Sequence, residues 1–360
     1  MKHPAYKIYL YFTKIFSLMK PIYRLIFLIF LAQSPVTFAD DYVLGHGYNS
    51  GSWNISGYAT AELNLANQRA ANFTVNDFSI FIHGRVNHYI NPFFEGEYAN
   101  QALWVEGAGV LSSGAGQFVL ERLYNDSYFT DSVFLRAGKM LTPVGEWNLI
   151  HAAPLVATTI RPLTTYLNFS EFTSGGSLNY VAEHNSLLPS AILYYQPSEE
   201  LLPKTLASSP YRYKNVSGLQ LVYARYLDWR VGFSMQHSEV INRHERQTLF
   251  SWDGRYDFDV FSLEMQASYN QISGNPKIRQ RNDEWGGYLQ LTVPVIDDWS
   301  LIGRGETFTA RGAKSSQQNA VFAVNYRPNA ALVWKLEYLF VKGATTNLNE
   351  GVYTSFGVMF

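Results

Sequence analysis

The stretch DEWGGYLQLTVPVIDDWSLIGRGETFTA, residues 283–310, alternates apolar and polar side chains with a period of two. Successive side chains of a β-strand point to opposite faces, so Trp285 and Leu289 share one face while Glu284 lies on the other. A pair of aspartates then makes a tight turn, and a second strand repeats the pattern, interrupted by Ile302 among its polar positions. The stretch therefore predicts an antiparallel hairpin with one apolar and one polar face.

The same alternation recurs from residue 52 to the carboxyl end, and no segment there has the ~18 uninterrupted apolar residues of a transmembrane helix. Reading the whole chain in this way gives sixteen candidate strands. They cover residues 52–64, 73–89, 93–103, 117–129, 132–141, 175–184, 188–196, 215–226, 229–240, 245–257, 259–271, 284–294, 299–309, 318–327, 331–342 and 350–360.

The connections between these strands alternate in length. Short turns follow the even-numbered strands and longer loops follow the odd-numbered ones, the longest being residues 142–174. An even number of strands, with short turns at one end and long loops at the other, is typical of an outer-membrane barrel. The sequence thus predicts an all-β fold, a transmembrane antiparallel up-and-down β-barrel of sixteen strands.

A soluble β-sandwich or a solenoid is the alternative to this barrel. A sandwich also alternates, but its outward face should be charged. Here the apolar face carries aromatic side chains such as Trp252 and Trp334, which suit the interfacial girdles of a membrane barrel. We therefore favour the barrel.

The amino-terminal segment is predicted to be a signal peptide, residues 1–39. Lys20 and Arg24 precede a short apolar run, and small residues stand at positions −3 and −1 of a cleavage site after Ala39. The apolar run is shorter than the ~20 residues of a membrane anchor. Translation is expected to begin at Met19.

The mature chain should comprise a short periplasmic segment, residues 40–51, and a single barrel, residues 52–360. The signal contains five of the 28 Lys and Arg residues and no acid, which leaves 23 basic against 29 acidic residues, a net charge of −6. This balance gives no sign of a nucleic-acid partner. Only about a dozen residues precede the first strand, so no plug of the kind found in energy-coupled transporters is expected.

The polar face of the strands would line the barrel interior. A row of inward charges requires a water-filled lumen, because an unpaired buried charge costs several kcal/mol; a ladder of ion pairs filling a closed lumen is the alternative. The faces of two strands stay undecided, since Glu121 and Arg122 are adjacent and Arg225 falls opposite Gln220. The candidate pore-lining residues on strands are Arg85, Glu95, Glu97, Glu264, Arg304, Glu306, Lys335 and Glu337.

The loop 142–174 holds three prolines and several large apolar residues, so it is expected to be ordered and functional. We expect it to fold into the lumen and narrow the pore; covering the mouth or contacting a neighbouring subunit is the alternative. Its polar members, the candidate constriction residues, are Glu146, His151, Arg161 and Glu171.

The stretch LRAGKMLTPVGEW, residues 135–147, resembles the strand-to-loop signature of the phosphate-selective porin O/P-like family of bacterial outer-membrane porins. The resemblance implies a sixteen-stranded, trimeric porin of the general-diffusion or anion-preferring kind. This chain departs from the lysine cluster expected of phosphate-selective members, because its loop holds no lysine after the signature. The matching residues are Arg136, Gly138, Lys139, Pro143 and Gly145.

The last strand, GVYTSFGVMF, residues 351–360, must pair with the first strand near Trp53 so that no edge is left unsatisfied in lipid. It also looks like the carboxy-terminal strand that the barrel assembly machinery recognises, with Phe360 as the assembly signal. The implied partners are that machinery, outer-membrane lipid and lipopolysaccharide, further copies of the chain in a trimer, and small solutes or ions.

Enzymatic motifs are lacking in the sequence. It has no cysteine, no phosphate-binding loop with its lysine, and no HExxH pair, so no cofactor and no metal site are predicted. The expected function is a porin in the outer membrane of a Gram-negative bacterium, a passive channel for small hydrophilic solutes or ions. A structural or adhesive barrel without an open pore, and an outer-membrane hydrolase, are the alternatives.

Overall fold

The computed structural model describes residues 42–110, 116–150, 152–183, 186–204, 211–225, 228–275, 277, 279–343 and 345–360. The predicted signal peptide, residues 1–39, and the candidate His151 lie outside the described residues, so both stay predictions.

Sixteen long strands form the wall, one for each predicted strand. The first eight are β3 (Trp53–Ala66), β4 (Asn72–Gly84), β5 (Pro92–Val105), β7 (Gln117–Tyr128), β8 (Val133–Leu141), β9 (Phe172–Tyr180), β10 (Ser190–Gln196) and β11 (Tyr213–Arg225). The second eight are β12 (Trp229–Val240), β13 (Glu245–Asp257), β14 (Ser262–Ser273), β15 (Asp283–Ile296), β16 (Trp299–Thr309), β17 (Gln317–Asn329), β18 (Leu332–Lys342) and β19 (Gly351–Met359).

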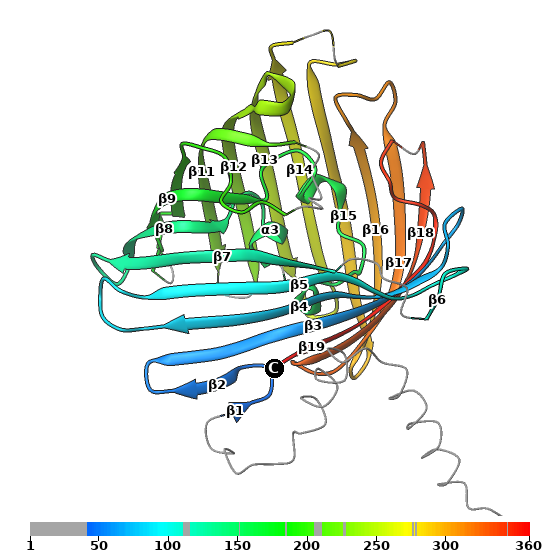
Figure 1. Ribbon diagram of the computed structural model, residues 1–360, viewed down its shortest axis with the longest axis horizontal. Coiled ribbons are helices and arrows are strands. Elements are labelled where there is room, and N and C mark those ends of the chain that lie inside the picture. The colour runs from blue at the N-terminus through cyan, green and yellow to red at the C-terminus, as the bar shows by residue number, and fades with distance from the viewer. Residues whose placement is uncertain are drawn as a thin grey trace, which may run out of the picture. The chain divides into compact units, whose positions relative to one another are not determined.

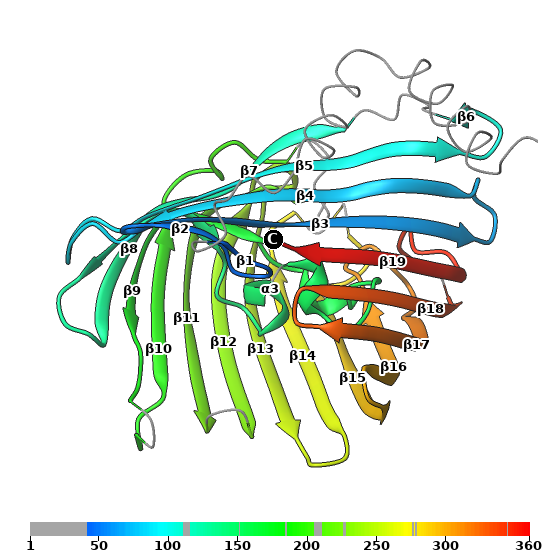
Figure 2. The same ribbon diagram turned by 90° about the horizontal axis from the view of Figure 1, so that it is seen from below.

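Each of these strands pairs antiparallel with its neighbours, and the last pairs with the first. The closing ladder runs from Gly351 opposite Ala66 to Met359 opposite Tyr58, so β19 and β3 lie side by side in both ribbon views (Figures 1 and 2). Closure gives each of the sixteen described wall strands a partner on both sides, as a barrel in a membrane requires. The predicted all-β, sixteen-stranded antiparallel barrel is confirmed.

Several short elements accompany the wall. β2 (Gly47–Ser50) pairs with the start of β3, and β6 (Gly109–Val110) pairs with the end of β5. The others are β1 (Tyr42–Val43), α3 (Trp147–Ile150), η1 (Ala153–Leu155), η2 (Leu163–Thr165) and η3 (Ile241–Arg243). Within the described residues, none of the helices has the length and apolarity needed to cross a membrane.

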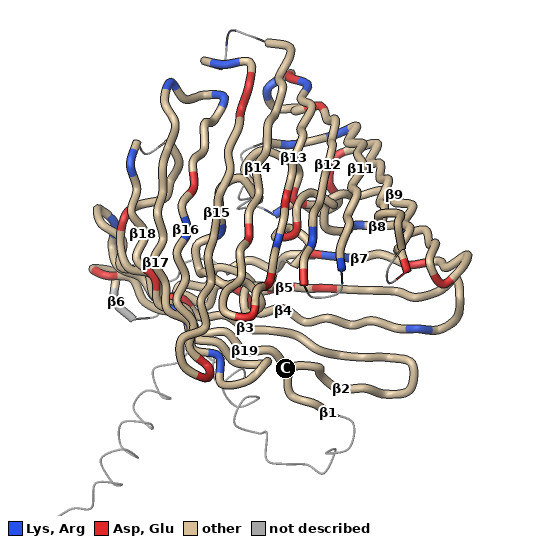
Figure 3. Tube along the Cα trace, turned by 180° about the vertical axis from the view of Figure 1, so that it is seen from behind, with Lys and Arg blue, Asp and Glu red and all other residues tan. Residues whose placement is uncertain are grey.

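The outer face of the wall is apolar and the inner face is polar. On β13 to β15, Trp252 and Leu289 are exposed on the outside, whereas Gln266 and Glu284 are buried on the inside. Figure 3 shows that charged positions occur along β12 to β16 as well as in the loops. Ile302, which interrupts the alternation of β16, lies on the inner face and is buried.

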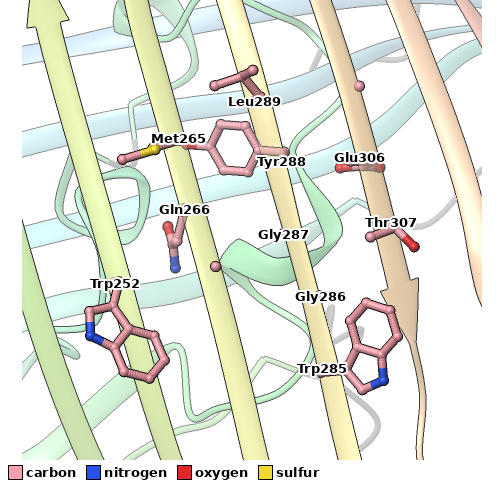
Figure 4. A pocket seen from close by; sticks show the side chains of 12 residues that line it. Trp252, Met265, Gln266, Trp285, Gly286, Gly287, Tyr288, Leu289, Glu306 and Thr307 are labelled. Atoms are coloured by element: carbon pink, nitrogen blue, oxygen red, sulfur yellow. The ribbon is translucent and has the colours of Figure 1, made fainter.

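The outer face also holds a shallow hollow of about 600 Å³ where small residues thin the wall. Trp252, Trp285 and Leu289 surround it and Gly287 forms part of its floor (Figure 4). Its lining is mostly apolar and belongs to the face that would meet lipid.

A β-bulge explains why Glu121 and Arg122 could not be assigned to faces. On β5 and β7, Glu95 is opposite Arg122 and the next residue, Gly96, is opposite Leu120. The extra residue is therefore Glu121, and a bulge of this kind turns two consecutive side chains toward the same face. On β11 a register shift lies between Lys214 and Ser217; beyond it the faces alternate, with Gln220 buried inside and Arg225 exposed on the outside near the strand end.

β4 ends five residues earlier than the alternation predicts. The chain turns after Gly84, and the side chain of Asn87 accepts hydrogen bonds from the backbone N–H groups of Tyr89 and Ile90. An Asn side chain that bonds its own following backbone in this way stabilises a turn over a strand. Arg85, expected on the strand, therefore lies just beyond it, where its N–H donates to the carbonyl of Ser52.

Candidate pore and its lumen loop

The connection between β8 and β9, residues 142–171, enters the barrel. Its helix α3 lies within the ring of strands in both ribbon views (Figures 1 and 2). The indole of Trp147 donates to the inner-face carboxylate of Glu264, and Asn168 accepts through its carbonyl from Gln247 and Asn270. We call residues 142–171 the lumen loop.

Charged residues of β16 to β18 hold the lumen loop by its backbone. Lys335 donates to the carbonyl of Ala153 at 2.6 Å, and Arg304 donates to the carbonyl of Ile160 at 2.8 Å. Glu337 accepts from the N–H of Ile160 at 2.7 Å. Hydrogen bonds to charged groups are about twice as strong as neutral ones, so these residues fix the path of the loop across the wall.

This arrangement corrects the expected role of several candidates. Arg304, Glu306, Lys335 and Glu337 do face inward, but the lumen loop covers them and each is at most 8% exposed. Glu306 accepts from the N–H of Leu163. They are loop anchors rather than charges in contact with open lumen.

Apolar contacts complete the attachment of the loop. Ile302 packs with Val321 and Leu339 on the inner face of the wall, and Ala157 and Ile160 of the lumen loop pack against them. Burial of such side chains contributes about 1.5–3 kcal/mol each. The isoleucine that breaks the polar pattern of β16 is thus part of the seat for the loop.

The lumen loop is also braced internally. Arg161 donates to Glu171 at 2.6 Å, to the amide oxygen of Asn148 at 2.8 Å and to the carbonyl of Thr165 at 2.6 Å. These contacts join the middle of the loop to both of its ends. Two of the expected constriction residues, Arg161 and Glu171, are therefore brought together.

A cavity of about 180 Å³ lies between the lumen loop and the inner face of β3, β4 and β5. We call this cavity the constriction. Four carboxylates and two cations line it, together with uncharged residues. The charged lining residues are Glu62, Asp77, Glu97, Glu171, Arg161 and Lys204.

Lys204 reaches the constriction from the loop that follows β10. Its ammonium lies 2.6 Å from Glu121 and 4.0 Å from Glu97. Burial alone would lower the pKa of Lys204, but Glu121, Glu171 and Glu97 together raise it above its usual value. A second ion pair, Lys139 with Glu200 at 2.7 Å, ties the same loop to β8.

The inner wall beyond the constriction carries stacked aromatic rings and arginines. Phe93 and Tyr124 stack with ring centroids 5.0 Å apart, and the guanidinium groups of Arg122 and Arg136 lie 4.5 and 3.9 Å from these two rings. Arg122 is paired with Glu95, and Arg136 binds its own acid partner through two hydrogen bonds. We call this region the arginine wall.

The arginine wall exposes its cations more than its acids. The Arg122 side chain is 20% exposed while Glu95 is fully buried, and Arg136 is 28% exposed against 11% for Asp126. Glu95, predicted to line the pore, is thus covered by its own partner.

Arg85 lies at the mouth, among the residues lining a cavity of about 510 Å³.

The remaining candidates are distributed around the lumen. Glu146 pairs with Arg255 at 2.7 Å and lies 3.9 Å from Arg230, so it faces the wall opposite the constriction. Glu264 binds Trp147 and Tyr288. The described residues contain no group of three or more His, Asp or Glu side chains placed to hold a metal ion.

The residues of the LRAGKMLTPVGEW stretch shape the exit of the lumen loop from the wall. Gly138 and Gly145 both have positive φ, and a Cβ on Gly138 would lie 2.1 Å from the carbonyl oxygen of Leu123. Pro143 is buried where the chain leaves β8. Glycine is required at such close approaches, so the pattern is explained by backbone geometry.

Sequence reasoning missed Asp77 and Lys204 as constriction residues. Asp77 follows a register shift between β3 and β4, which hides its face from simple alternation. Lys204 belongs to a loop whose path the sequence does not reveal. The sequence pointed to Lys204 only indirectly, because β5 and β7 carry inward acids, Glu97 and Glu121, that need a basic partner.

No protein-family model matches the sequence, and no curated protein matches it. Solved structures do match. In-vitro folded OmpT of Vibrio cholerae in its trimer form is 14% identical, with 87% of this chain and 99% of that chain covered and a TM-score of 0.59. OmpF of Salmonella typhi, in complex with daunomycin, is 12% identical over 88% and 100% of the two chains, with a TM-score of 0.63.

An anion-selective porin from Comamonas acidovorans is 12% identical, over 85% of this chain and 97% of that one, with a TM-score of 0.55. At such identities the likeness concerns the fold. It extends over nearly the whole length of each of these three porins. The chain has the fold of bacterial outer-membrane porins.

Proposed function

We propose that the protein is a passive channel in the outer membrane of a Gram-negative bacterium, conducting small hydrophilic solutes and ions. The constriction carries this proposal, because the anchored lumen loop and the inner face of β3 to β5 line a charged cavity between them. Charged side chains beside an aqueous passage set which solutes enter it and how fast they cross. No nucleophile or metal centre is needed for such a task, and we infer no enzymatic activity.

We further infer a preference for cations. Four carboxylates against two cations give the constriction a net formal charge of −2, and a field of one sign concentrates ions of the opposite sign. This charge balance supports general diffusion with cation preference. It does not support the phosphate selectivity of the porin O/P-like family, whose strand-to-loop signature residues 135–147 resemble.

Planar-bilayer recording tests the proposal. Purified protein should give discrete conductance steps, and a KCl gradient should give a reversal potential of the sign expected for K⁺ preference. Asp228→Asn, in an exposed turn away from the constriction, is a control that should leave both unchanged. Absence of steps from correctly folded protein would contradict the channel and favour a structural barrel.

Assembly follows from the same fold. We propose a homotrimer embedded in lipopolysaccharide and lipid, delivered by a cleaved signal peptide and inserted by the barrel assembly machinery through the strand ending at Phe360. The trimer form of one matching porin supports the oligomeric state. Cross-linking of the detergent-solubilised protein, followed by denaturing electrophoresis, tests it.

A further inference from the structure

The inner wall presents an acidic region and a region of partly exposed arginines in series along the passage. The constriction presents carboxylates from β3 and β4, whereas the arginine wall presents guanidinium groups from β7 and β8. Both regions lie on the inner face of β3 to β8. A solute moving along this wall therefore meets an acidic and then a basic region, or the reverse.

The spacing of the two regions follows from the strand register. Ala99 of β5 is opposite Asp77 and Glu95 of the same strand is opposite Arg122. These two rows are four positions apart on β5, which corresponds to about 13 Å along a strand. An extended peptide of about four residues has its two charged ends this far apart.

The arginines have hydrogen-bonding capacity left for a ligand. Arg122 uses its Nε atom for Glu95, and no hydrogen bond to a described residue is made by its two terminal nitrogens. Arg136 uses Nε and one terminal nitrogen for Asp126. Because the rings of Phe93 and Tyr124 hold the guanidinium planes in place, the remaining N–H groups are oriented in advance for a carboxylate.

From this geometry we infer that the pore binds zwitterionic solutes whose ammonium and carboxylate are about 13 Å apart, the chemistry of short linear peptides. The ammonium lies at Asp77 and the carboxylate lies at Arg122, the two positions whose rows are this far apart. The ammonium is attracted to the acidic region and the carboxylate to the partly exposed arginine, which aligns the solute along the wall. The inference rests on the proposed channel function and names a substrate class for it.

Block of single-channel current by tetraglycine tests the inference. Tetraglycine should block with an apparent Kd about tenfold lower than either N-acetyl-tetraglycine or tetraglycine amide, because each capped form loses one charged contact. Diglycine, which is too short to span both regions, should lose this advantage. Equal block by all four peptides would overturn the inference.

Charge-neutral pair replacements locate the carboxylate site. Glu95→Gln with Arg122→Gln, and Asp126→Asn with Arg136→Gln, each remove one acid and one base, so the net charge of the lumen stays constant. The first pair should abolish the tetraglycine advantage over its amide, whereas the second pair, which lies four positions further along the strands, should retain it. Arg225→Gln, which removes an arginine from the outer face, is the matched control and should leave peptide block unchanged.

These measurements separate the two proposals. If the wild-type protein gives no KCl conductance, the channel function fails. If it conducts and the first pair replacement leaves the preference for free peptide ends intact, the channel stands and the peptide site is excluded.

Discussion

The backbone N–H of Ile160, in the lumen loop, donates a 2.7 Å hydrogen bond to the carboxylate of Glu337 on β18. The N–H of the preceding residue, Thr159, donates to the other oxygen of the same carboxylate at 3.0 Å. A single wall residue thus clamps the part of the loop that faces the constriction. The two partners are 177 positions apart in the sequence, so this contact joins the lumen loop to one of the last strands of the wall.

Replacing this carboxylate should loosen the lumen loop. Glu337→Ala removes two hydrogen bonds to a charged group, each contributing about 1.5–3 kcal/mol. We expect single-channel recordings with higher open-channel noise and a larger mean conductance, because the loop can move away from the wall. Glu239→Ala, at the end of β12, is the control; identical noise in all three proteins would show that the clamp does not hold the loop.

Ion selectivity should depend on the acids of the constriction. Glu62→Gln and Asp77→Asn each remove one negative charge from the cavity lining, so the reversal potential in a KCl gradient should move toward zero. Lys335→Gln, whose ammonium is bonded to the lumen-loop backbone, should instead alter noise and stability. A shift for Lys335→Gln without one for Glu62→Gln would place the selective charges elsewhere.

Lys204 should act as a permanent cation of the constriction. Burial works against its charge, but Glu121, Glu171 and Glu97 raise its pKa above the usual lysine value. A lysine with a raised pKa keeps its proton, and the stability that this charge contributes, throughout the range below its unfolded pKa. Lys204→Gln should therefore increase K⁺ preference by the same amount at pH 6 and at pH 9.

The control for this pH comparison is a cation that makes no contact in the constriction. Arg225→Gln should leave the reversal potential unchanged at both pH values. If the effect of Lys204→Gln disappears at pH 9, then Lys204 loses its proton in that range and the acidic neighbours do not hold it charged.

The sequence predicts the barrel well because lipid and water impose a strict alternation on every strand. All sixteen strands occur where the pattern places them, apart from end positions such as that of β4, where the Asn87 turn ends the strand. The bulge at Glu121 escaped prediction because one extra residue shifts the register without changing composition.

The site is less accessible to prediction than the wall. Alternation tells which face a residue occupies, and Arg304 and Lys335 do face inward. It does not tell what covers that face. Only the path of the lumen loop shows that these charges are anchors, that Ile302 is part of the seat of the loop, and that Lys204 completes the constriction.

The last residue of the chain should matter for barrel closure more than for conduction. The N–H and carbonyl of Phe360 bond the carbonyl and N–H of Gly57, and its ring stacks on Phe78 with centroids 5.8 Å apart. Deleting Phe360 removes the backbone pair and the ring together. Phe360→Ala removes the ring alone, and an aromatic pair contributes on the order of 1 kcal/mol beyond its burial.

We therefore expect the yield of heat-modifiable, folded barrel in outer-membrane fractions to fall in the order wild type, Phe360→Ala, deletion. Met359→Ala, whose side chain lies on the inner face, is the control for a change at the chain end. The channels that do form should conduct as wild type does, because the closing pair lies far along β3 from Glu62. A deletion variant that folds in full yield but conducts differently would assign Phe360 to the pore rather than to closure.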